Sequence, residues 1–162
     1  MCEICGIIDF SKKGCEVSPL LRMWTSSAPL GRGFAYLHAG IAIAGERDKD
    51  LCAIHQATAN ENRILLLGEN KRNFLAEELL YIYENEGLSY LKITTRGICF
   101  ALLDEKKKLF ALSCGSDPLF CSDKDGKIIF ASKKEALGHY SPELPLIATT
   151  ISPNGFVIYS KT

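Results

Sequence analysis

The stretch Met1-Cys2-Glu3-Ile4-Cys5-Gly6-Ile7-Ile8-Asp9-Phe10 opens this chain and decides the fold that we expect. A cysteine directly behind the initiator methionine runs at once into an apolar, β-branched segment typical of a strand. Removal of Met1 would leave Cys2 with a free α-amine beside its own thiol. These groups titrate near ~7.7–8.0 and ~8.5, so one residue supplies both nucleophile and proton acceptor. The alternative is that Cys2 is a small buried hydrophobe.

Further motifs follow in collinear order along the whole chain. They are Pro29-Leu30-Gly31-Arg32-Gly33-Phe34, Ile41–Arg47, Leu66-Leu67-Gly68-Glu69, Gly97–Asp104, Asp117-Pro118-Leu119-Phe120, Ile129–Leu137 and Pro153-x-Gly155. Together with the opening stretch they resemble the N-terminal nucleophile (Ntn) glutaminase domain of class II glutamine amidotransferases. The resemblance is strongest to asparagine synthetases, which begin Met-Cys-Gly-Ile-x-Gly, a pattern from which only Glu3 departs.

The resemblance implies a role for four residues. Cys2 would attack the side-chain amide of glutamine, and the backbone N–H of Gly68 would help to bind the oxyanion. Arg47 would grip the α-carboxylate of the substrate and Glu69 its α-amine, because a guanidinium pairs well with a carboxylate. The substrate would be glutamine or a related small amide, and no metal or organic cofactor would be required.

Arg47 also has a plainer interpretation. As a surface arginine it would pair with the neighbouring Glu46 or Asp48. The resemblance favours the substrate-binding role over this alternative.

Leu67 departs from the family pattern at a chemical position. It replaces the asparagine whose side-chain amide, in the family, helps to bind the oxyanion. Loss of one such donor lowers turnover by roughly 10²–10³, although the backbone N–H of Gly68 remains as the second donor. We therefore expect attenuated activity.

Two further departures concern the walls of the predicted site. Residues 27–30 lack the arginine, glycine and aspartate that the family has in its framing loop. The Ser-Asp pair that holds the substrate amine in the family also has no counterpart here. Glu69 would hold that amine alone, or Glu84 and Glu86 would substitute for the pair.

Composition narrows the range of functions. A chain of 162 residues, 47% hydrophobic and 23% charged, predicts one soluble domain over residues 1–162. An ammonia-using synthetase would then be a separate chain. Nineteen basic residues balance nineteen acidic ones, which argues against nucleic acid as a partner. With no leader and no apolar run near ~18 residues, we expect a cytoplasmic protein without membrane contact. A homo-oligomer is left open.

Seven cysteines, an odd number without a secretory signal, predict reduced thiols. Cys2 and Cys5 have the spacing of a redox pair, and Cys114 with Cys121 would complete a four-thiolate zinc set. The spacing of Cys114 and Cys121 is too wide for a zinc knuckle. Thioredoxin-like pairs lie between a strand and a helix, whereas Cys2 and Cys5 stand at the start of a predicted strand. Both alternatives rank below the nucleophile.

The residue pattern predicts mainly strands. They are Ile4–Phe10, Gly33–Ala44 with a break at Gly40, Arg63–Leu67, Gly97–Leu103, Lys108–Leu112 and Lys127–Ala131. Several are apolar on both faces, which suits sheets buried on both sides. One helix would be capped by Ser18 before Pro19, and a second would run from Asn73 to a stop at Gly87. The expected fold class is α+β, with the family's four-layer αββα sandwich of two mostly antiparallel sheets flanked by helices.

Three functions fit these observations. The first is a glutaminase-type domain that hydrolyses glutamine through Cys2 and supplies ammonia to a separate synthetase chain. The second is a degenerate module that binds an amino acid or a partner protein without turnover, for which Leu30, Leu67 and the missing Ser-Asp pair argue. The third is an Ntn amidase for another, less polar amide.

Overall fold

The computed structural model describes most of the chain. The described residues are 3–11, 14, 16–27, 33–68, 73–124, 126–141 and 146–160. Cys2, Glu69 and Leu30, on which parts of the prediction depend, lie outside the described residues. The chain divides into two compact units, one formed by residues 2–47 and 118–151 and the other by residues 48–117 and 152–162. The prediction of one domain over residues 1–162 stays a prediction.

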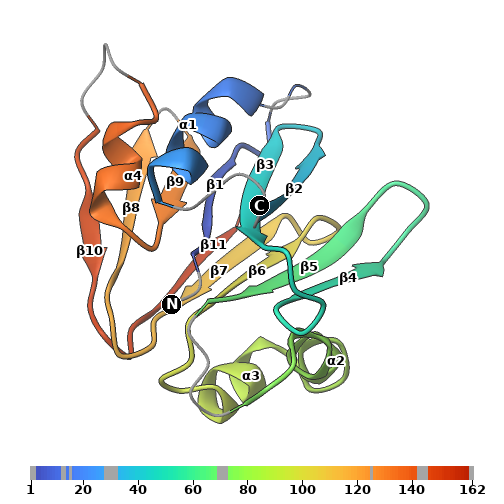
Figure 1. Cartoon of the computed structure of the whole chain (residues 1–162). Helices are drawn as coiled ribbons and strands as arrows, with labels where there is room; N and C mark the ends of the chain where they lie inside the picture. Colours follow the sequence, from blue (N-terminus) through green and yellow to red (C-terminus); the bar gives the residue numbers. More distant parts are fainter. Residues whose placement is uncertain are drawn as a thin grey trace. The chain divides into compact units, whose positions relative to one another are not determined.

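The first unit, here called the six-stranded unit, holds one antiparallel sheet and two helices (Figure 1). Its elements are β1 (Cys5–Ile8), α1 (Val17–Ser27), β2 (Gly33–His38), β3 (Ile41–Glu46), β8 (Leu119–Lys124), β9 (Lys127–Ala131), α4 (Lys134–Gly138) and β10 (Thr149–Ile151). The strand order is β10-β8-β9-β1-β3-β2, so the N-terminal strand lies in the interior of the sheet.

Strand β1 is buried on both faces. Cys5 and Ile7 join a core that includes Met23 and Trp24 of α1, while Ile8 on the opposite face is also fully buried. Between them, a Cβ on Gly6 would lie 2.6 Å from side-chain atoms of β3 and β9, so only glycine fits there. The predicted strand is confirmed, and Cys5–Ile8 lie in the interior of the sheet.

The second unit, here called the five-stranded unit, also holds one antiparallel sheet and two helices. Its elements are β4 (Cys52–Gln56), β5 (Asn62–Leu67), α2 (Ala76–Glu86), α3 (Leu88–Thr94), β6 (Phe100–Asp104), β7 (Leu109–Ser113) and β11 (Phe156–Ser160), in the strand order β11-β7-β6-β5-β4. Leu65 and Leu67 of β5 share a core with Leu79 and Leu80 of α2. Burial on both faces is therefore confirmed here too, because the intervening Leu66 is 1% exposed.

Most predicted elements are confirmed, with shifted ends. The long strand Gly33–Ala44 is a β2–β3 hairpin that turns at Ala39 and Gly40, whose φ angles are 47° and 89°. Helix α2 ends before Gly87 as predicted, where φ is 88°, but it begins at Ala76 and not at Asn73. The capping role of Ser18 is wrong, because α1 already begins at Val17.

Two antiparallel sheets, each with helices packed on it, confirm the predicted α+β class. Within the described ranges, no helix combines the length and apolar character needed to cross a membrane.

Candidate functional site

Polar contacts anchor the chain immediately after Cys2. The N–H of Ile4 donates to the Ser132 hydroxyl at 3.1 Å, and the N–H of Ser132 donates to the Ile4 carbonyl at 2.9 Å. The Ser132 hydroxyl itself donates to Glu3 Oε2 at 2.5 Å, and Lys133 Nζ lies 3.2 Å from Glu3 Oε1. Glu3 is only 5% exposed, so its charge is matched where it is buried. Backbone bonds therefore fix Ile4, and side-chain contacts hold Glu3.

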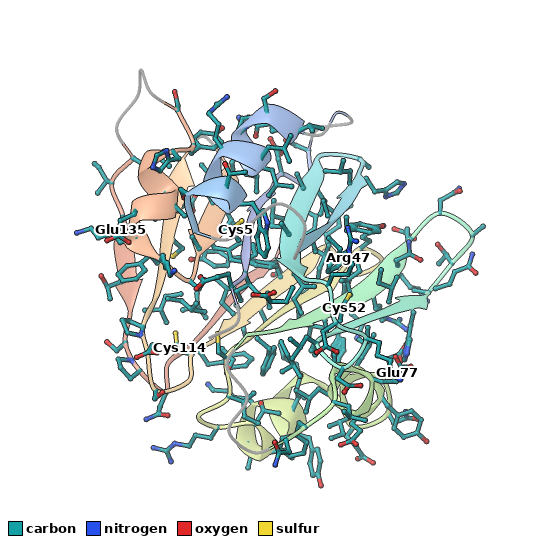
Figure 2. All side chains as sticks on the ribbon, viewed as in Figure 1. Cys5, Arg47, Cys52, Glu77, Cys114 and Glu135 are labelled. Atoms are coloured by element: carbon teal, nitrogen blue, oxygen red, sulfur yellow. The ribbon has the colours of Figure 1, made fainter. Side chains whose placement is uncertain are left out.

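Arg47 directly follows β3 in the six-stranded unit, and its side chain is exposed (Figure 2). Its Nε donates to the carbonyl of Gly33 on the neighbouring strand β2 at 3.3 Å. Among the described residues it forms no ion pair with Glu46 or Asp48, the plainer interpretation of this arginine. The substrate-binding role of Arg47 stays a prediction.

Gly68 follows β5 in the five-stranded unit and is buried. Its N–H donates to the carbonyl of Cys99 at 2.8 Å. A Cβ at this position would lie 2.7 Å from Cys99 Sγ, so the close approach of the two segments requires glycine. An oxyanion would have to displace the Cys99 carbonyl to use this N–H, and the predicted role of Gly68 stays a prediction.

The grouping of the four predicted residues in one site stays a prediction. Arg47 belongs to one unit and Gly68 to the other, and each unit is described by itself. Cys2 and Glu69 lie outside the described residues.

Glu84, the proposed substitute for the missing Ser-Asp pair, is engaged elsewhere. His55 on β4 is bound on one ring nitrogen by Glu84 and on the other by Glu77. The second oxygen of Glu84 accepts a hydrogen bond from Arg63 Nη1 at 3.1 Å, and Arg63 Nε donates to Asp104 at 3.1 Å. These pairs tie α2 to the sheet, so Glu84 has a structural role. The alternative that Glu84 and Glu86 hold the substrate amine stays a prediction.

This network acts on His55, to which the sequence assigned no role. Partial burial lowers the pKa of His55, but its hydrogen bonds to Glu77 and Glu84 and their charges raise that pKa overall above 6.5. The network was missed because its members lie on four separate elements, β4, β5, α2 and β6.

The described cysteines are packing residues. All five are free thiols, as predicted: Cys5, Cys52, Cys99, Cys114 and Cys121. Burial, with the charge of Glu3, raises the pKa of Cys5 to about 12, and burial, with the charge of Glu77, raises that of Cys52 to about 11. Thiols with such high pKa values are poor nucleophiles at neutral pH. No group of three or more histidine, cysteine, aspartate or glutamate side chains among the described residues is arranged to hold a metal ion.

Comparison with known proteins gives a likeness in structure only. No family model matches the sequence, and no curated protein matches it. A solved glutamine phosphoribosylpyrophosphate (PRPP) amidotransferase from B. subtilis, complexed with ADP and GMP, is 12% identical over 98% of this chain, with a TM-score of 0.50. The structure described as the allosteric regulatory enzyme of purine biosynthesis is 13% identical over 98% of the chain, with a TM-score of 0.51.

The chain shares their fold. At 12% and 13% identity this likeness shows the fold alone, and the predicted class of glutamine amidotransferase stays a prediction. The closer resemblance to asparagine synthetases stays a prediction. This chain covers 49% and 48% of the two similar chains, about half of their length.

Proposed function

We propose that this chain is a glutaminase-type amidotransferase domain that hydrolyses the side-chain amide of glutamine through Cys2. The observation that supports the proposal best is the fold shared with a glutamine PRPP amidotransferase along 98% of the chain. The position of Cys2 in the sequence is the second support. That cysteine precedes an interior strand whose start is pinned by Ser132 and Lys133.

The proposed reaction needs only the chain and water. After removal of Met1, the α-amine of Cys2 takes the proton of its thiol, and the sulfur bonds to the side-chain carbonyl carbon of glutamine. The amine returns the proton to the leaving nitrogen as the carbon–nitrogen bond breaks, and ammonia leaves. Water then attacks the thioester, which releases glutamate and restores the thiol. The ammonia would pass to an ammonia-using synthetase on another chain.

The other predicted residues would bind and polarise the substrate. Arg47 would grip the α-carboxylate and Glu69 the α-amine of glutamine. Gly68 would donate to the oxyanion after exchanging its bond with the Cys99 carbonyl. Because Leu67 has no amide to add a second donor, we expect turnover lowered by roughly 10²–10³.

One specific observation favours a module that binds without turnover. At the end of β5 the side chain of Leu67 is packed in the core and the N–H of Gly68 is already bonded. A site with neither donor free would bind glutamine, or another amino acid, without stabilising its tetrahedral intermediate.

Glutamate release from glutamine tests the proposal. Intact-mass measurement first establishes that Met1 is absent from the protein, because a retained Met1 turns the amine into an amide. We expect slow release that Cys2→Ala abolishes. Cys52→Ala is the matched control, since it removes a partly exposed thiol with a high pKa, and release should be unchanged.

Labelling with a glutamine-like diazoketone separates the two candidates. Covalent modification of Cys2 together with glutamate release supports the glutaminase. Modification without release supports the module that binds but does not turn over. Processed protein that shows neither modification nor release overturns both.

A further inference from the structure

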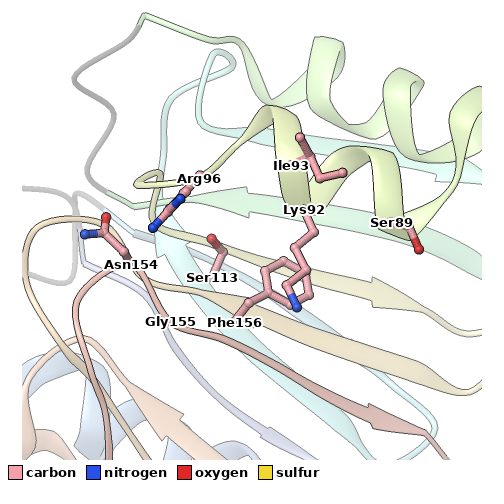
Figure 3. A pocket seen from close by; sticks show the side chains of 8 residues that line it. All are labelled: Ser89, Lys92, Ile93, Arg96, Ser113, Asn154, Gly155 and Phe156. Atoms are coloured by element: carbon pink, nitrogen blue, oxygen red, sulfur yellow. The ribbon is translucent and has the colours of Figure 1, made fainter.

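A pocket of about 650 Å³ lies within the five-stranded unit, between helix α3 and the start of β11 (Figure 3). Its lining residues are Ser89, Lys92, Ile93, Arg96, Ser113, Asn154, Gly155 and Phe156. The volume is in the range of small-molecule sites, roughly 300–1,000 Å³. Arg47 and Gly68, the described residues predicted to bind glutamine, are not among these lining residues.

The described lining of the pocket carries positive charge. Lys92 and Arg96 both belong to it, and none of the described residues that line the pocket is an aspartate or glutamate. Within the described ranges, neither cation belongs to an ion pair. Two unneutralised cations beside the neutral donors of Ser89 and Asn154 favour an anion with several acceptor oxygens.

An apolar surface lies next to these charges. The ring of Phe156 is held edge-on by the fully buried Phe100, with centroids 6.1 Å apart and an interplanar angle of 69°. Lys92 Nζ lies 5.5 Å from the centroid of the Phe156 ring. Ile93 on the lining is 78% exposed. The pocket therefore offers an apolar, partly aromatic wall within reach of a cation.

The backbone around the charged end is fixed. Gly97 has a φ of 84°, and a Cβ there would lie 3.2 Å from Asn154 Oδ1. The N–H of Asn154 donates to the Gly115 carbonyl at 3.0 Å, and the buried Ser113 hydroxyl donates to the Ile98 carbonyl at 2.7 Å. These bonds hold both sides of the pocket in place without a ligand, so binding would require little ordering of the backbone.

We propose that this pocket binds a small organic phosphate. The phosphate group would pair with Lys92 and Arg96, with the Asn154 amide as a further donor, and an apolar or planar body would lie against Phe156. A phosphate monoester is the best match because it carries close to two negative charges and three strong acceptor oxygens near neutral pH. The proposal stands on this pocket alone and is independent of glutamine turnover.

Titration of the full chain with phenyl phosphate, followed by amide NMR and calorimetry, tests the proposal. We expect shifts confined to residues 92–97, 113–115 and 154–156. The double variant Lys92→Gln, Arg96→Gln should weaken binding at least tenfold. Lys106→Gln, an exposed lysine of the same unit outside the pocket, is the control and should stay within twofold. Equal affinity in the double variant, or shifts spread over lysines elsewhere, would overturn the proposal.

A second variant tests the aromatic wall. Phe156→Leu should reduce the preference for phenyl phosphate over inorganic phosphate about threefold or more and leave the affinity for inorganic phosphate within twofold. Circular dichroism and thermal unfolding of each variant establish that it is folded before binding is measured. Unchanged preference in a folded Phe156→Leu protein would contradict the part assigned to the ring.

Discussion

Two segments of the molecule differ from the sequence pattern that the chain resembles, one before β1 and one at the end of β5, and the two differing residues are accommodated in opposite ways. At the start of β1, the unusual Glu3 is buried but has two polar partners, Ser132 and Lys133. At the end of β5, the unusual Leu67 is packed into the core against the helices, and the next residue donates its N–H to Cys99.

The difference shows two ways in which the residues beside a strand can be buried. A buried carboxylate is tolerated only with partners, and Ser132 and Lys133 supply them for Glu3. A buried leucine needs only apolar neighbours, which the helix-facing core supplies. The first arrangement depends on polar contacts and the second on apolar packing.

The largest loss of stability should come from replacing Leu67 by asparagine, the residue that the resembled family has at this position. Leu67→Asn places an amide in a position that is 1% exposed and surrounded by core residues. Lost burial and an unsatisfied polar group should lower the free energy of unfolding by about 3 kcal/mol or more. Glutamate release should not rise, because the new amide replaces a side chain of the helix-facing core.

Urea unfolding and the glutaminase assay check this prediction together. Leu67→Met conserves volume and serves as the control, with an expected loss below about 1.5 kcal/mol. A Leu67→Asn protein of unchanged stability and faster turnover would show that this side chain reaches a catalytic site. That result would contradict its assignment to the helix-facing core.

A smaller loss is expected at the neighbouring glycine. Gly68→Ala places a Cβ 2.7 Å from Cys99 Sγ, and the overpacking should lower the free energy of unfolding by about 2 kcal/mol. Adding Cys99→Ala removes that sulfur and should recover part of the loss, although the Cys99 Cβ at 3.3 Å remains close. Equal stability of the single variant and the parent in thermal unfolding would mean that the two segments are not closely packed.

Local sequence signals predicted the elements that depend on local patterns. Strands β1, β5 and β9 are short apolar runs rich in isoleucine and leucine, and α2 combines helical spacing with a glycine stop. These features act through nearest neighbours, so one sequence suffices to recognise them. The edge strand β4 was missed because His55 and Gln56 interrupt its apolar character, and α4 was missed because it is only five residues long.

The candidate site was harder to predict because its contacts join distant parts of the chain. Ser132 holds Ile4 across 128 residues, and neither side chain signals the other. Lys92 and Phe156 of the phosphate pocket likewise meet only through tertiary structure. Resemblance supplied Cys2, Arg47, Gly68 and Glu69, but the bond that occupies the Gly68 N–H follows from packing and has no sequence signature.

The polar contacts before β1 can be weakened by removing a single oxygen atom, that of the Ser132 side chain. Ser132→Ala removes the acceptor of the Ile4 N–H and the donor to the buried Glu3, so we expect a loss of about 1.5 kcal/mol in the free energy of unfolding. If the anchor positions Cys2, glutamate release should fall further than stability explains. Ser26→Ala, which removes only a bond to the Met23 carbonyl within its own helix, is the control. Full activity and stability of Ser132→Ala would show that the anchor is dispensable.

The smallest loss of stability should come from removing His55, which links β4 to α2. Unlike the other losses, it should depend on pH. His55 has a folded-state pKa above 6.5, because Glu77 and Glu84 stabilise its charged form despite partial burial. A raised folded pKa stabilises the fold fully below the unfolded value, and this contribution disappears as pH rises through the folded pKa. His55→Gln should therefore lower stability most near pH 6, by less than about 1 kcal/mol because the pair is partly exposed, and least at pH 9.

Thermal unfolding from pH 6 to pH 9 measures the difference in stability between the parent protein and the His55→Gln variant. Glu77→Gln removes one of the two carboxylates and should reproduce part of the same pH-dependent loss, whereas the Ser132→Ala loss should not follow this profile because His55 takes no part in the Ser132 contacts. A gap for His55→Gln that stays constant from pH 6 to pH 9 would mean that the histidine acts through packing alone. The charged link between β4 and α2 would then have no part in holding the helix that covers Leu67.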